Sequence, residues 1–113
     1  MKQINAIIQP HILGKVERAL HALPHFPGFT LLRVKGHARS TVAAHTHPLI
    51  EWDLDEHDKI LLLILSSDEL APQIIEVIQH NAHTGLPGDG LVWESDVNQI
   101  IRIRTGECGK NAV

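Results

Sequence analysis

The chain has 113 residues, of which 43% are hydrophobic and 20% charged, so we expect one folded domain with its own core. Its formal net charge of −3 argues against general nucleic-acid binding, which usually needs a basic face. Cys108 is the only cysteine, which excludes an internal disulfide and a four-thiolate zinc site.

The first third of the chain predicts a strand, a helix and a second strand. Residues 2–7 have the length and β-branched content of a strand. Apolar residues then recur at helical spacing from Ile12 to Leu23, which predicts an amphipathic helix of about three turns. Prolines and a glycine over residues 24–28 end this helix, and residues 29–36 predict the second strand.

A long segment without periodicity separates this unit from the next strand. Residues 37–58 far exceed the usual connection of about four to six residues, so we expect a functional loop. Residues 59–66 form a continuous apolar run, which suits a strand buried on both faces or in a subunit interface. Ser66 and Glu69 have capping-box spacing and predict a second helix, with Pro72 in or near its first turns.

Two short strands are expected after the second helix, around residues 91–93 and 100–104. The order is then β-α-β-loop-β-α-β with a short additional strand. This alternation predicts an α+β, ferredoxin-like fold (βαββαβ), in which an antiparallel sheet carries two helices on one face.

The chain shows no pattern of a targeting or membrane segment. The longest apolar stretch, residues 60–65, is too short to span a bilayer, and the N-terminal apolar run is too short for a signal peptide. We therefore expect a cytoplasmic protein without direct membrane insertion.

Two stretches near the C-terminus suit phosphate binding. In TGLPGDG, residues 84–90, the glycines around Asp89 leave backbone N–H groups free to converge on an anion. Arg102 and Arg104 lie two residues apart on the expected strand, so both guanidinium groups would project from one face towards a di- or triphosphate. No Gly-Lys-Ser/Thr follows the glycines, which excludes a Walker loop. Each stretch alone also fits a simpler interpretation: residues 84–90 could form only a tight turn, and the two arginines could lie on a solvated strand face.

Four motifs together resemble those of the PII nitrogen-regulatory signalling proteins. They are INAIIQP at the start, RVKGHARS before the long loop, TG followed by GDG, and IRIRTGE near the C-terminus. Their spacings agree along nearly the whole chain, with one extra residue near the turn at 24–26. The resemblance implies one PII-like domain over residues 1–113 that forms a homotrimer. The T-loop would be residues 37–58, the B-loop 83–90 and the C-loop 102–109.

The resemblance also implies an adenine-nucleotide site, for ATP or ADP, between neighbouring subunits. Gly88, Asp89 and Gly90 would hold the phosphates through their backbone, and Arg102 and Arg104 would reach the same phosphates from the adjacent subunit. The other residues implied near the nucleotide are Ile7, Thr30, Gly36, Arg39 and Leu65. Such a protein is a non-enzymatic signal-transduction regulator whose T-loop controls a partner, for example a membrane transporter or a metabolic enzyme.

The chain departs from the family pattern at positions that decide its ligands. Leu91 replaces the usual lysine after Gly-Asp-Gly, so one cationic phosphate contact is lost and preference could move towards ADP or AMP. Ser40 replaces the glutamine that coordinates Mg²⁺ with 2-oxoglutarate, which puts that effector in doubt, although Lys59 would still allow a small anion to bind. Trp52 replaces the tyrosine that is uridylylated in enteric relatives and is a candidate partner-docking residue.

Histidines in and beside the long loop offer an alternative function. His45, His47 and His57 carry ligands that suit zinc, nickel or copper. The alternative is therefore a metal-binding or metal-responsive PII-like protein, linked to metal or small-anion transport. The histidines lack a recognised ligand spacing, so an exposed polar loop rich in histidine is the simpler interpretation.

Overall fold

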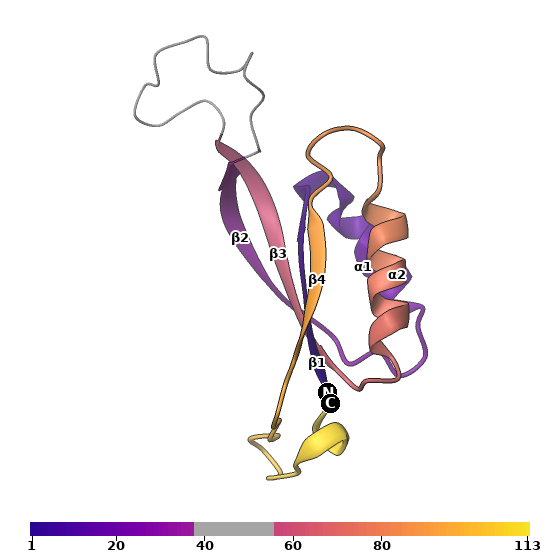
Figure 1. Ribbon diagram of the computed structural model, residues 1–113, viewed down its shortest axis with the longest axis vertical. Coiled ribbons are helices and arrows are strands. Elements are labelled where there is room, and N and C mark those ends of the chain that lie inside the picture. The colour runs from indigo at the N-terminus through magenta and orange to yellow at the C-terminus, as the bar shows by residue number, and fades with distance from the viewer. Residues whose placement is uncertain (38–55) are drawn as a thin grey trace.

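An antiparallel sheet forms the base of the fold (Figure 1). A computed structural model describes residues 1–37 and 56–113. Within these ranges the strands are β1 (Lys2–Ile8), β2 (Thr30–His37), β3 (Glu56–Ser66) and β4 (Leu91–Asp96). Their order across the sheet is β2-β3-β1-β4, so β1 and β3 are central.

Two helices cover one face of this sheet (Figure 1). A short 3-10 helix, Pro10–Ile12, leads into α1 (Leu13–His21), and α2 (Ala71–Ala82) follows β3. The core lies between the layers and consists of alternate residues of β1 and β3 with the apolar sides of both helices: Ile4, Ala6, Ile8, Ile60, Leu62, Ile64, Val16, Leu20, Ile74 and Ile78. No helix of the described ranges has the length and hydropathy that a membrane crossing requires.

The opposite face of the sheet, here called the open face, has no covering layer among the described residues. Strand pairing aligns Leu32, Leu61, Ile7 and Leu91 in one row across it, and Thr30, Leu63, Asn5 and Trp93 in the next. Leu61 and Leu63 are half-buried, whereas Leu32 is 47% and Trp93 43% exposed. We expected residues 59–66 to be buried either on both faces of the sheet or in a subunit interface. Within one subunit, only the side chains of this strand that face the helices are fully buried.

Several predicted boundaries differ from the structure. The first helix ends at His21 rather than Leu23. Ser66 does not cap the second helix, because it is the last residue of β3 and is buried. α2 has no side-chain cap, and the hydroxyl of Ser67 accepts a hydrogen bond from the Leu70 N–H at 3.3 Å in the turn before the helix.

The ends of the long predicted loop belong to strands. Gly36 pairs with His57, and His37 pairs with Glu56, so β2 and β3 form a hairpin that extends into the predicted T-loop. The segment between the hairpin ends, residues 38–55, lies outside the described residues.

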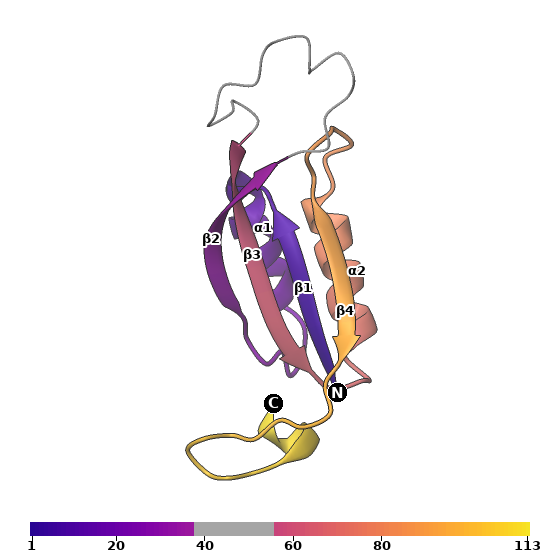
Figure 2. The ribbon, with the colours of Figure 1, turned by 60° about the vertical axis from the view of Figure 1, so that its left-hand side comes forward.

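The strand predicted around residues 100–104 is wrong. β4 ends at Asp96, and the chain then passes beyond the end of the sheet (Figure 2). An isolated bridge joins Ile101 to Cys108, and the Gly106 N–H donates to the Arg102 carbonyl at 2.7 Å to close a turn between them. The Arg102 N–H donates to the Glu107 carbonyl and the Gly109 N–H to the Ile100 carbonyl, both at 2.9 Å, so this segment pairs with itself rather than with a strand of the sheet.

Candidate functional site

The carboxylate of Asp89 closes the B-loop on itself. Its Oδ2 accepts hydrogen bonds from the N–H groups of Thr84 at 2.7 Å and Gly85 at 3.0 Å, and its Oδ1 accepts from the Thr84 hydroxyl. His83 Nδ1 lies 3.7 Å from Asp89 Oδ2. These interactions, the Thr84 hydroxyl first, lower the pKa of Asp89 below its ordinary value of 3.8. Asp89 therefore shapes the loop with its side chain, which leaves its backbone for a ligand.

Glycines allow the B-loop to lie directly against the end of β1. Gly88 has a φ of 96° and Gly90 a φ of 101°, both in the region that favours glycine. A Cβ on Gly90 would lie 1.7 Å from the carbonyl oxygen of Ile7, so only glycine fits there. Within the described residues the N–H groups of Gly88 and Asp89 have no hydrogen-bond partner. Adjacent free N–H groups beside a glycine at positive φ are the arrangement that an anion-binding concavity needs, and anion binding here stays a prediction.

Two side chains hold the carbonyl group of Gly88. Gln9 Nε2 donates to this oxygen at 3.0 Å, and Lys59 Nζ donates to it at 2.9 Å. A cavity of about 610 Å³ adjoins this contact and is lined by Gln9, His57, Lys59, Gly88 and neighbouring residues. Lys59, predicted as a small-anion contact, therefore lies at the B-loop. The sequence predicted no role for Gln9, although it lies in the INAIIQP motif directly before Pro10.

Residues of the second predicted wall gather at the other end of the molecule. A cavity of about 340 Å³ is lined by Thr30, Leu65 and Arg102, together with Leu63, Phe29 and Val113 among others. Arg102 Nη2 donates to the Ala112 carbonyl at 3.0 Å, which fixes the guanidinium group at this cavity. Arg104 is exposed in the turn, and within the described residues its side chain has no partner. The two arginines thus lie in a turn, which corrects the prediction of two parallel side chains on a strand.

The two walls are at opposite ends of the sheet (Figures 1 and 2). The B-loop touches Ile7 at the end of β1, whereas the Val97 N–H donates to the Met1 carbonyl just before β1 begins. β1 has seven residues and spans about 23 Å at the rise of a strand. The phosphates of one nucleotide cannot contact both walls of the same subunit, so a cleft made of both walls requires a second copy of the chain.

The remaining predicted site residues divide into those the structure describes and those it does not. Ile7 lines a cavity of about 160 Å³ with Asp89, Gly90 and Leu91. Gly36 lies on β2 beside Lys59, whose Cγ would be 3.1 Å from a Cβ on that glycine. Five residues fall outside the described ranges, so their predictions stay predictions: Arg39, Ser40, His45, His47 and Trp52.

The metal hypothesis finds no support among the described residues. His57 is exposed at the start of β3. Across residues 1–37 and 56–113, no three histidine, cysteine, aspartate or glutamate side chains come together as a metal site would require.

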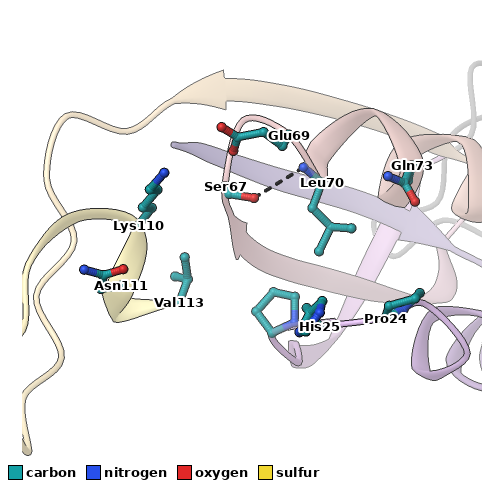
Figure 3. A pocket seen from close by; sticks show the side chains of 10 residues that line it. Pro24, His25, Ser67, Glu69, Leu70, Gln73, Lys110, Asn111 and Val113 are labelled. Carbon is teal, nitrogen blue, oxygen red and sulfur yellow. Dashed lines mark hydrogen bonds between the residues drawn. The ribbon is translucent and has the colours of Figure 1, made fainter.

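A separate hollow of about 460 Å³ lies near the start of α2 (Figure 3). Figure 3 shows Glu69 and Gln73 from this region, with Lys110 and Val113 on the C-terminal segment and His25 on the turn before β2. His25 has a φ of 61°, which is unusual for a residue other than glycine. None of the predicted nucleotide residues lines this hollow, although it shares Pro27 and Val113 with the cavity at Arg102.

Comparison with known proteins identifies relatives along the whole chain. Residues 1–107 match the model of a family described as nitrogen regulatory protein P-II. The chain is 37% identical over 113 residues to the nitrogen regulatory protein P-II of Azospirillum brasilense, and 38% identical over 113 residues to that of Porphyra purpurea. In both comparisons the alignment covers 100% of each protein. A protein of Methanothermobacter thermautotrophicus named nitrogen regulatory protein P-II 2 is 37% identical, with 97% of its length covered.

Proposed function

The chain belongs to the nitrogen regulatory protein P-II family, and on that basis we propose that it binds an adenine nucleotide between subunits and controls a partner protein. The family supports a signal-transduction regulator, and the relatives are named as regulatory proteins. The observation that carries the proposal is the pair of complementary walls, one built from backbone N–H groups and one from arginines, at opposite ends of a single subunit.

A homotrimer would bring the two walls together. The open face carries Leu32, Leu61, Leu63 and Trp93, an apolar surface of the kind that an interface between copies covers. When three copies pack around this face, the B-loop of one subunit can meet Arg102 and Arg104 of the next. The phosphates would then bind the N–H groups of Gly88 and Asp89, with the base near Thr30 and Leu65.

The charges of this cleft favour a nucleotide with fewer phosphates than ATP. Each arginine supplies a charge-assisted hydrogen bond worth about 1.5–3 kcal/mol. Leu91 is 71% exposed beside the B-loop and supplies no charge there. We propose that ADP and AMP compete effectively with ATP, and that Mg²⁺ acts only through the phosphates.

The regulatory output would come from the segment between β2 and β3. A ligand that binds two states of this loop with different affinities shifts the population between them. We propose that the favoured state controls a transporter or a metabolic enzyme in the cytoplasm, without turnover of the nucleotide.

Calorimetric titration with ATP, ADP and AMP, with and without Mg²⁺, tests the nucleotide site. We expect binding at one site per chain, and a loss of about tenfold or more in affinity for Arg104→Ala without a change in thermal stability. If the unmodified protein binds none of the three nucleotides, the proposal is wrong.

Mixed trimers test whether the walls come from different subunits. Arg104→Ala chains and chains with a defective B-loop, such as Asp89→Ala, are unfolded together, refolded and titrated with ADP. Each mixed trimer would contain an intact B-loop facing an intact arginine wall, so part of the tight binding should return. If both walls belonged to one subunit, mixing would restore nothing.

A further inference from the structure

We propose that Gln9 is a positioning residue that orients the Gly88–Asp89 peptide group for phosphate binding. The inference deepens the proposed function and rests on it. It assigns a role to Gln9, which lies in the INAIIQP motif but for which the sequence predicted no role.

The planarity of the peptide group links the Gln9 contact to the ligand. In a trans peptide the carbonyl and the following N–H lie in one plane and point in opposite directions. Gln9 Nε2 binds the Gly88 carbonyl at 3.0 Å, so the N–H of Asp89 is directed away from Gln9. Among the described residues this N–H has no partner, which leaves it available to an anion.

Without such a contact, the peptide could rotate. Gly88 adopts a positive φ and carries no side chain, so its neighbouring peptide groups have more freedom than those of other residues. The Asp89 side chain fixes the first part of the loop through Thr84 and Gly85, and Gly90 fixes its end against Ile7. The Gly88 carbonyl lies between these fixed points, and Gln9 holds it.

The backbone of Gln9 is itself well anchored. It has an extended conformation, with φ −73° and ψ 140°, directly before Pro10, which restricts it to such values. Its carbonyl also accepts a hydrogen bond from the Ile12 N–H at 3.1 Å. A donor placed on a rigid element holds its acceptor more accurately than one on a flexible loop.

Lys59 shares the same acceptor but differs in character. A carbonyl oxygen has two lone pairs, so it accepts from Lys59 at 2.9 Å and from Gln9 at the same time. The lysine ammonium is a compact charge on a flexible stem, and a bound anion attracts this ammonium group. Gln9 is neutral, so a phosphate does not draw it away, and it keeps the peptide oriented when the ligand is bound.

Three substitutions at position 9 distinguish a hydrogen-bond donor from a packing residue. Gln9→Ala removes the donor, Gln9→Glu keeps the shape and removes the donor, and Gln9→Lys restores a donor. ADP affinity would be measured by calorimetry at 0.5 M salt, where added charges are largely screened beyond about 3–4 Å. Gln73→Ala and Gln73→Glu on the exposed surface of α2 are the matched controls.

We expect Gln9→Ala and Gln9→Glu to weaken ADP binding by about three- to tenfold, and Gln9→Lys to stay within about twofold of the unmodified protein. Thermal unfolding and size-exclusion chromatography check that each variant folds and assembles. Retained affinity in Gln9→Ala or in Gln9→Glu would overturn the inference and leave the proposed function intact. Failure of the unmodified protein to bind any nucleotide would instead remove the proposed function, and the inference with it.

Discussion

The B-loop and the C-loop are both expected to contact phosphates, but the subunit builds them in different ways. The B-loop is held by the Asp89 carboxylate, by Gln9 and Lys59 at Gly88, and by the contact of Gly90 with β1. The C-loop is closed mainly by its own backbone, and apart from Arg102, which donates to the Ala112 carbonyl, its side chains make few contacts. Ile103 is 98% exposed, and Arg104 is exposed beside it.

The B-loop would therefore contribute fixed backbone geometry to phosphate binding, and the C-loop would contribute charge. The B-loop presents backbone N–H groups that are already oriented, so binding there loses little conformational freedom. The exposed Arg104 must become ordered when it binds, and its side chain loses up to about 2 kcal/mol of rotamer freedom. Changes in the B-loop should therefore affect stability and binding together, whereas changes in Arg104 should affect binding alone.

The largest effect is expected from Gly90→Ala. The new Cβ would meet the Ile7 carbonyl oxygen at 1.7 Å, and alanine would also have to adopt a φ of 101°. Strain and overpacking together should cost about 3 kcal/mol of unfolding free energy and remove nucleotide binding. Chemical denaturation and calorimetry measure the two effects.

Gly85→Ala is the matched control within the same loop. Gly85 has a φ of 84°, but the nearest atom to an added Cβ is His83 Nε2 at 3.9 Å. The unfolding free energy of Gly85→Ala should therefore fall by only about 1–2 kcal/mol, the conformational cost of a positive φ in alanine. Equal losses from the two variants would show that the contact of Gly90 with β1 does not support the B-loop.

A gain of function is expected from Leu91→Lys. Leu91 is 71% exposed, so a lysine there need not bury its charge, and its ammonium can reach phosphates at the B-loop. ATP affinity should rise by about tenfold, with a smaller rise for AMP, because the contact is charge-assisted. Leu86→Lys, at a position 69% exposed in the same loop, controls for added charge. An equal rise in ATP affinity for Leu91→Lys and Leu86→Lys would mean that the added positive charge acts in general and not through a specific contact at position 91.

Residue type and spacing along the chain predicted the strands and helices that are determined by neighbouring residues. The β-branched content of residues 2–7 and the helical spacing that includes Val16 and Leu20 identified two elements that form part of the core. The capping prediction is wrong because Ser66 is buried as the last residue of β3, and α2 begins only at Ala71 without a side-chain cap. The strand predicted at residues 100–104 is wrong because the chain turns after Arg102 and pairs back on itself at Cys108, outside the sheet.

The site shows the same limit. The glycines around Asp89 predicted a turn with positive φ, which the structure shows because this conformation follows from local composition, whereas anion binding by the turn stays a prediction. The contacts of Gln9 and Lys59 with Gly88 could not be predicted, since these residues are separated by 79 and 29 positions from the glycine. Only the antiparallel register of β1 and β3 brings them to the B-loop.

The smallest effect is expected from the acid titration of Asp89. Hydrogen bonds from Thr84 and Gly85 lower the pKa of Asp89 below 3.8. The ionised carboxylate therefore contributes fully to the stability of the protein above pH 3.8, and this contribution is lost as the pH falls through the lowered pKa. Thermal unfolding of the protein and of Asp89→Asn should therefore differ by a constant small amount from pH 8 to about pH 5. The difference should close below about pH 4, where protonation removes the charge that the variant lacks at every pH. If the difference instead closed near neutral pH, a group other than the Asp89 carboxylate would control the loop.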